Sequence, residues 1–155
     1  MKVKIFGWFI CRDRLSMMAN LHRKIITTGS SCPRCGISLE EMHLTLLCPC
    51  AAQVWSCLGL QVSLAIDLIW DTPIPIGLDI NIWPTVVIFI LWKLPDSRNA
   101  RVFRNVMHSP PPPPPQDTIR NIILDFMLWA FRFKDPISRE AAISWRMYLS
   151  TRCNP

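Results

Sequence analysis

The sequence predicts a mainly α-helical protein with four parts: a small cysteine-rich helical module, an irregular connection, a polyproline linker and a C-terminal helical hairpin. Apolar residues recur at helical spacing, three cysteines gather between residues 32 and 48, and six prolines are consecutive. Fourteen prolines against five glycines also argue against one continuous compact core. The predicted boundaries are 1–60 for the module, 61–107 for the connection and a helix, 108–116 for the linker and 117–155 for the helical tail.

Three helices are predicted in the module, over residues 3–12, 17–24 and 51–58. Pro49 stands where the third helix can begin, because proline tolerates the first helical position. Gly59 stands where that helix can end. The cysteine-rich loop would then lie between helical elements. The residues expected to point inward from the third helix are Val54, Trp55 and Leu58.

The connection is expected to be irregular over residues 60–84, where tryptophans and a Pro-Ile-Pro turn replace any clear period. A helical pattern returns from Thr85 to about Asn105. Pro95 lies within it and is expected to break or sharply kink the helix, because proline removes a backbone donor and clashes with the preceding turn. The candidate buried positions of this helix are Ile88, Trp92, Val102 and Phe103.

Six prolines, residues 110–115, are expected to form an extended polyproline II spacer. Beyond it, Asp117 or Thr118 can cap a helix that runs to about Lys134, and Ser138 can cap the next one. Such a hairpin needs a surface to pack on, which is either the helices before the spacer or a second chain. Its apolar faces comprise Ile119, Ile122, Ile123, Phe126, Met127 and Ala130 on the first helix, and Ala142, Trp145, Tyr148 and Leu149 on the second.

The chemical motif of the chain is C-x2-C-x7-H-x4-C, formed by Cys32, Cys35, His43 and Cys48. A Cys-x-x-Cys turn can direct two sulfurs at one metal ion, and a histidine and a third cysteine complete a tetrahedron of the kind that zinc prefers. Cys50 is an alternative to Cys48 as the fourth ligand. Two buried thiols and a surface histidine without metal remain the simpler interpretation of the same residues.

Three thiolates and one imidazole would saturate Zn²⁺, so the predicted site is structural and not catalytic. The sequence also carries no glycine-lysine phosphate loop, no H-E-x-x-H, no G-x-S-x-G and no carboxylate cluster of the two-metal type. We therefore expect no catalytic residues and no enzyme activity. Cys11, Cys57 and Cys153 are expected to be core or unpaired thiols.

The net charge of +6 is unevenly distributed along the chain. Residues 1–39 carry +6, residues 40–92 carry −5, and residues 93–155 carry +5. A basic N-terminal third beside a metal motif suggests RNA or DNA as a partner, although solvated basic surfaces are common in other proteins. The candidate phosphate-binding residues are Arg12, Arg14, Arg23, Lys24 and Arg34.

Seven cysteines are an odd number, and no apolar leader follows Met1, so reduced thiols in the nucleus or cytoplasm are expected and secretion is not. The longest apolar run, residues 85–92, is far shorter than the roughly 20 residues that a membrane-spanning helix needs. We expect no membrane association through a spanning helix. Oligomeric state does not follow from the sequence.

Several stretches resemble a known family: K-V-K-I-F-G-W-F-I-C-R-D-R-L, L-H-R-K, C-P-R-C-G, H-L-T-L-L-C-P and A-A-Q-V-W. They look like the zinc-binding domain of reverse transcriptases from plant LINE-type (non-LTR) retrotransposons, over roughly residues 2–58. The resemblance implies structural Zn²⁺ held by Cys32, Cys35, His43 and Cys48. In that family the domain lies C-terminal to a polymerase, and no polymerase portion is present in this sequence.

The resulting expectation is a zinc-binding, nucleic-acid-associated module from a retrotransposon reverse transcriptase, present as an isolated C-terminal fragment without activity of its own. Two alternatives belong to other classes. One is a zinc-organised protein-interaction module whose C-terminal helices contact a reverse transcriptase or another protein. The other is a translated retroelement remnant without function.

Overall fold

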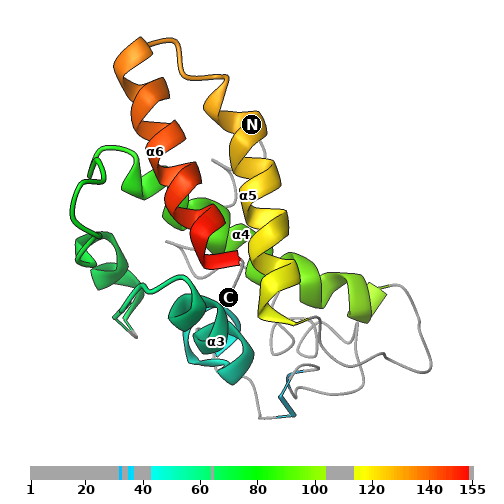
Figure 1. Ribbon diagram of the computed structural model, residues 1–155. Helices are drawn as coiled ribbons and strands as arrows, with labels where there is room; N and C mark the ends of the chain where they lie inside the picture. Colours follow the sequence, from blue (N-terminus) through cyan, green and yellow to red (C-terminus); the bar gives the residue numbers. More distant parts are fainter. Residues whose placement is uncertain (1–31, 33–34, 37–42, 64, 104–113, 154–155) are drawn as a thin grey trace.

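The computed structural model describes residues 32, 35–36, 43–63, 65–103 and 114–153 (Figure 1). The helices predicted over 3–12 and 17–24, and most of the predicted linker, lie outside these residues. The described part is helical and contains no strand, which confirms the predicted mainly α fold. None of its helices is both long and apolar enough to cross a bilayer. The elements are η1 (His43–Leu47, a π-helical turn), α3 (Pro49–Cys57), η2 (Ile66–Asp71, a 3₁₀ helix), α4 (Trp83–Phe103), α5 (Pro115–Ala130) and α6 (Pro136–Cys153).

Helix α3 begins and ends where the sequence predicts. Pro49 occupies its first turn. At its C-terminus Gly59 has a positive φ of 68°, its N–H donates to the Ser56 carbonyl at 2.9 Å, and the Leu60 N–H donates to the Trp55 carbonyl at 3.1 Å. This pair of bonds is a Schellman motif, which requires a left-handed residue and therefore favours glycine. Val54, Trp55 and Leu58 are buried, as predicted.

Pro95 was predicted to break or sharply kink the helix, and the structure shows that it does not break α4. The helix continues through Pro95 to Phe103. Proline still removes one backbone donor, at a cost of about 3 kcal/mol. Burial on most sides of α4 offsets this cost, since each large apolar side chain removed from water contributes about 1.5–3 kcal/mol. The buried apolar residues of α4 include Trp83, Val86, Val87, Phe89, Ile90, Leu91 and Leu94. Ile88 and Trp92, which were expected inside, are only half-buried, and the side chains of Val102 and Phe103 lie outside the described part of the structure.

The predicted C-terminal hairpin is formed by α5 and α6, which lie side by side (Figure 1). Helix α5 starts at Pro115, so the last two residues of the predicted linker are helical, and it ends at Ala130 instead of Lys134. Of the residues expected to face inward, Met127 and Tyr148 are half-buried and the others are buried. Asp135, and not Ser138, caps α6, because its carboxylate accepts the Ser138 N–H at 2.8 Å.

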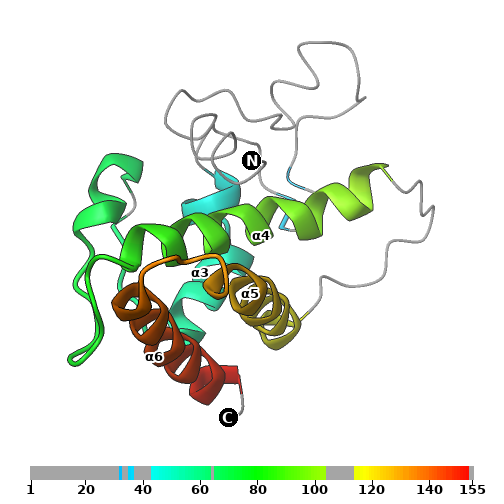
Figure 2. The ribbon, with the colours of Figure 1, turned by 90° about the horizontal axis from the view of Figure 1, so that it is seen from above.

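The buried apolar residues of the described helices form one core, although the proline content argued against one continuous core. Its buried residues run without interruption from Cys32 through α3 and α4 to Leu149 in α6. Helix α5 packs against α3, α4 and α6, and α4 crosses behind the hairpin (Figures 1 and 2). A salt bridge of 2.7 Å between Lys93 and Asp125 joins α4 to α5. The hairpin therefore packs on the helices that precede the spacer.

Three tryptophans of the core form indole N–H hydrogen bonds to the less regular segments. The indole N–H of Trp55 donates to the Thr45 carbonyl in η1 at 2.9 Å. Trp83 donates to Ile69 in η2 at 3.3 Å, and Trp145 donates to the turn carbonyl of Asp79 at 2.9 Å. The Trp83 and Trp145 rings also stack, with centroids 5.6 Å apart. A buried indole N–H needs an acceptor, and these segments supply it through backbone carbonyls.

Candidate metal centre

Cys32 and Cys35 are brought together by a tight turn. The Gly36 N–H donates to the Cys32 carbonyl at 2.7 Å. Gly36 has φ of 77°, and a Cβ on it would meet no atom within 4 Å. The requirement for glycine here is thus a matter of backbone conformation and not of space. Cys32 is buried and Cys35 is half-buried.

Cys48 is placed by the junction between η1 and α3. It is the N-cap residue of α3, with extended backbone angles, and its carbonyl accepts the N–H groups of Ala51 and Ala52 at 2.8 and 2.9 Å. Its side chain is completely buried. The Trp55 bond to Thr45 holds η1 against α3 and so fixes this junction. This supporting role is not evident from the sequence, in which the spacing of Trp55 predicts only a buried apolar residue.

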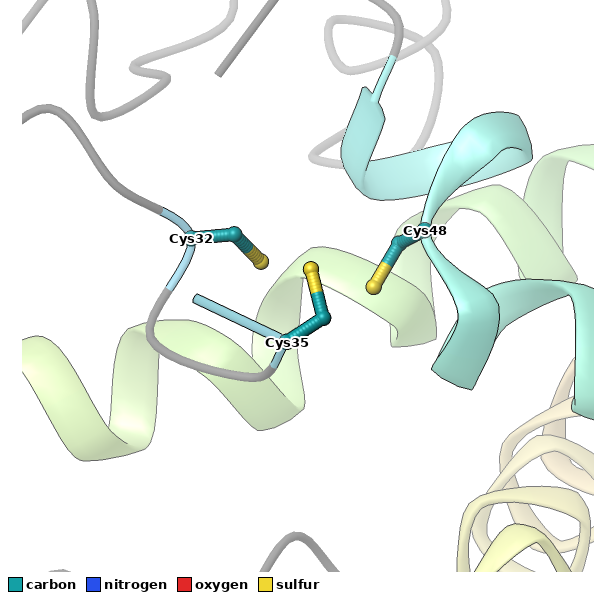
Figure 3. A group of neighbouring side chains, drawn as sticks. All are labelled: Cys32, Cys35 and Cys48. Carbon is teal, nitrogen blue, oxygen red and sulfur yellow. The ribbon is translucent and has the colours of Figure 1, made fainter. Parts of the chain in front are cut away.

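The sulfur atoms of Cys32, Cys35 and Cys48 point toward one another (Figure 3) and all lie within 4.8 Å of each other. Tetrahedral zinc with Zn–S bonds of about 2.3 Å separates its sulfurs by about 3.8 Å. A small inward movement of flexible side chains therefore converts this arrangement into three corners of a zinc tetrahedron. The donor set and its spacing fit Zn²⁺ better than the oxygen-preferring Mg²⁺ or Ca²⁺.

A tetrahedral site needs a fourth ligand in addition to these three sulfurs. His43 begins η1, five residues before Cys48, but its side chain lies outside the described part of the structure. Cys50, the alternative to Cys48 in the sequence, lies in the first turn of α3 and does not join the three-sulfur group found among the described residues. The structure thus brings together three of the four predicted ligands.

The environment of Cys48 opposes its ionisation in the absence of a metal. Its pKa is raised, first because its thiol donates a hydrogen bond to the Cys32 sulfur and second because burial disfavours a thiolate. The backbone N–H groups of Cys50 and Ala51 act in the opposite direction. A bound cation reverses this balance, since a coordinating thiol is deprotonated. The N–H groups at the start of α3 then stabilise the thiolate.

The basic residues predicted to bind nucleic acid are Arg12, Arg14, Arg23, Lys24 and Arg34, and all of them lie outside the described residues. The structure therefore leaves this prediction as it stood. Among the described side chains, the basic ones are Lys93 on α4, where it pairs with Asp125, and those of α5, α6 and the turn between these two helices.

Comparison with known proteins supports the metal motif. Residues 1–55 match a family described as zinc-binding in reverse transcriptase. The matched segment contains all four predicted ligands and ends within α3. No curated protein and no solved structure shows significant similarity to the chain.

Proposed function

We propose that the N-terminal part of this chain is a structural zinc module of the reverse-transcriptase type, that it associates with RNA or DNA, and that it catalyses no reaction itself. In this proposal Cys32, Cys35, His43 and Cys48 hold one Zn²⁺. The observation that carries it is the convergence of three cysteine sulfurs within the segment that matches the family. These residues fit a metal that favours thiolates in a buried tetrahedral site.

The role assigned to zinc is structural. A complete set of three sulfurs and one nitrogen leaves no position for water or substrate. Cys32 and Cys48 are buried in the same core as the helices, so ligation would tie the turn at Cys32–Gly36 to the start of α3. Zinc would supply binding free energy that a short loop lacks, as it does in other small metal modules.

Association with nucleic acid is supported by charge. Residues 1–39 carry a net charge of +6, and the rest of the metal motif follows directly. Lysine and arginine side chains near one another bind phosphates with little dependence on base sequence. The proposal assigns this contact to Arg12, Arg14, Arg23, Lys24 and Arg34. The family description names zinc and reverse transcriptase, and it is consistent with a protein that works beside a nucleic acid.

Metal analysis of three cysteine variants tests the zinc site. We expect one equivalent of zinc in the purified chain and a loss of affinity greater than about 100-fold for Cys48→Ser, because replacing even an outer-shell partner costs about 10–100-fold. Affinity is measured by competition with a chromophoric chelator. Cys50→Ser and Cys57→Ser are matched controls, since both are half-buried cysteines on α3 outside the three-sulfur group.

The controls decide between ligand sets. If Cys50→Ser lowers zinc affinity and Cys48→Ser does not, Cys50 is the ligand and the assignment of Cys48 is wrong. Substoichiometric zinc in the unmodified chain would refute the module itself. His43→Ala should weaken binding by a similar factor to Cys48→Ser.

Binding to a single-stranded homopolymer tests the association with nucleic acid. We expect the logarithm of the binding constant to fall linearly with the logarithm of salt concentration, with a slope of about −0.7 for each phosphate neutralised. Arg23→Ala should reduce this slope, whereas Arg132→Ala in the hairpin should leave it unchanged. Absence of binding at low salt, or a slope insensitive to Arg23→Ala and Arg12→Ala together, would contradict the proposal.

A further inference from the structure

The hairpin carries an apolar groove that the core does not use. Between α5 and α6 lies a cavity of about 180 Å³ that opens to solvent. An apolar cavity of about 150 Å³ accommodates benzene, so this one has room for a leucine or phenylalanine side chain. We call it the hairpin groove; its lining residues are Met127, Ala130, Phe131, Arg139, Ile143 and Arg146.

The groove continues into a wider apolar surface on the side of α5 away from α4. Asp125 and Trp129 contact α4 through the Lys93 salt bridge and the Phe89 ring. Leu124 and Leu128 lie outside the buried face of the same helix. The exposed apolar residues beside the groove are Leu124 and Leu128 on α5 and Met147 on α6, each more than half exposed. Leu124 lies three residues before Met127, and Met147 lies four residues after Ile143, so helical spacing places them on the faces that line the groove. Exposed apolar side chains gathered on one face are characteristic of interaction sites.

The charged side chains that line the groove are both positive. Among the residues that the structure describes, Arg139 and Arg146 line it and no carboxylate does. Arg139 donates to the Phe133 carbonyl at 2.9 Å, whereas half-buried Arg146 forms no ion pair within the part of the chain that the structure describes. A guanidinium beside an apolar cavity gains most from a carboxylate, which it can bind in a bidentate manner.

From this combination we propose that the hairpin groove binds an acidic amphipathic helix of another protein. Such a helix would insert an apolar side chain into the cavity, lay further apolar residues at positions i+3, i+4 and i+7 over Leu124, Leu128 and Met147, and place a carboxylate against Arg146. A second copy of this chain fits less well, because two-fold pairing of the groove would bring its arginines together. The largely apolar surface of the groove also favours a protein over a nucleic acid. This proposal is independent of the zinc module.

Selection from a display library of helical peptides tests the proposal with the full-length chain as the target. The library keeps apolar residues at i, i+3, i+4 and i+7 and randomises the remaining positions among acidic, basic and neutral residues. We expect the enriched peptides to be acidic. Enrichment of neutral or basic peptides, or no enrichment at all, would overturn the proposal.

Two pairs of variants locate the bound peptide. Ile143→Ser and Arg146→Glu should each weaken binding of the enriched peptide at least ten-fold. Ile137→Ser and Arg132→Glu are the matched controls, because Ile137 is an exposed isoleucine of α6 outside the groove and Arg132 lies over Trp129. Equal effects of the groove and control variants would refute the assignment of the groove.

Two further measurements test whether the groove binds a second copy of the chain or a nucleic acid instead of a helical peptide. Light scattering should show a monomer, and a dimer that Ile143→Ser dissociates would assign the groove to a second copy and overturn the proposal. A single-stranded homopolymer should not displace the peptide. Displacement that Arg146→Glu abolishes would assign the groove to nucleic acid and likewise contradict the proposed partner.

Discussion

The contact between Gly59 and Tyr148 joins the end of α3 to α6 at a single position. The Tyr148 hydroxyl donates to the Leu58 carbonyl at 2.7 Å, and the Arg152 guanidinium lies over the tyrosine ring. A Cβ on Gly59 would come within 3.1 Å of the Tyr148 hydroxyl. Gly59 is therefore required twice, for its positive φ and for the space that it leaves to the tyrosine.

Replacing Gly59 by alanine should reveal both requirements. Gly59→Ala and Gly77→Ala each place a side chain at a positive φ, which costs about 1–2 kcal/mol. Only Gly59→Ala also displaces Tyr148, because a Cβ on Gly77 would meet no atom within 4 Å. We expect the larger loss of unfolding free energy for Gly59→Ala, measured by urea denaturation.

A double-mutant cycle isolates the steric part of this effect. Tyr148→Phe removes the hydroxyl and should itself cost about 0.5–1.5 kcal/mol. In that background Gly59→Ala should become less harmful by at least about 0.5 kcal/mol. Strict additivity of the two substitutions would show that the close approach has no energetic consequence.

At the scale of the element, α6 depends on the cap that Asp135 provides. Its carboxylate accepts hydrogen bonds from both the N–H and the hydroxyl of Ser138, at 2.8 Å each. Both bonds lower the pKa of Asp135 below its usual value, and the bond from the Ser138 N–H contributes more than the bond from the Ser138 hydroxyl. Because the folded-state pKa is lowered, the carboxylate stabilises the fold above the unfolded-state pKa of about 3.9, and this contribution disappears as the pH falls through the folded-state pKa.

Because the pKa of Asp135 is lowered in the folded state, the loss of stability in Asp135→Ala should depend on pH. The variant should melt at a lower temperature than the unmodified chain at pH 7, and the difference should shrink below about pH 4. Circular dichroism melting curves at several pH values measure both. Asp135→Asn is the control, since asparagine also caps helices but does not titrate. A difference for Asp135→Ala that is the same at pH 3 and pH 7 would contradict an ionised cap.

Several features of the individual helices could be predicted from the sequence, and others could not. The inward faces of α5 and α6, the glycine that ends α3 and the existence of a hairpin were predicted, because apolar period and turn chemistry are local properties. Ser138 was predicted as the cap of α6 in place of Asp135, since both are good caps and only the backbone path at Pro136 decides between them. Whether the helix breaks or continues at Pro95 was left open, because the outcome depends on burial from outside the helix.

At the scale of the whole molecule, the metal centre and the hairpin share one core. Cys32 and Cys48 belong to the same buried cluster as Phe126 in α5 and Trp145 in α6. Phe126 packs edge-on against Phe89 of α4, with ring centroids 5.9 Å apart. A substitution of a buried hairpin residue should therefore also lower the stability of the metal centre.

Phe126→Ala tests this coupling. Removing a buried phenylalanine should lower the free energy of unfolding by about 3–5 kcal/mol. With one core, zinc release and loss of helicity should occur in a single transition that shifts together to lower denaturant concentration. Leu128→Ala is the control, because Leu128 is 68% exposed and its loss should change stability by less than about 0.5 kcal/mol. Unaltered zinc release in Phe126→Ala would indicate an independent module.

By itself the sequence determined the helical class, the faces of α5 and α6, the cysteine motif and the glycine that ends α3, because each depends on residues close together in the chain. Only the tertiary structure decided that the prolines do not divide the core, that Trp145 binds a carbonyl 66 residues away, and that Cys48 is the cysteine that joins Cys32 and Cys35. It also showed that no described residue closes the hairpin groove. Such outcomes depend on which surfaces meet, and apolar period alone does not specify the partner of a face.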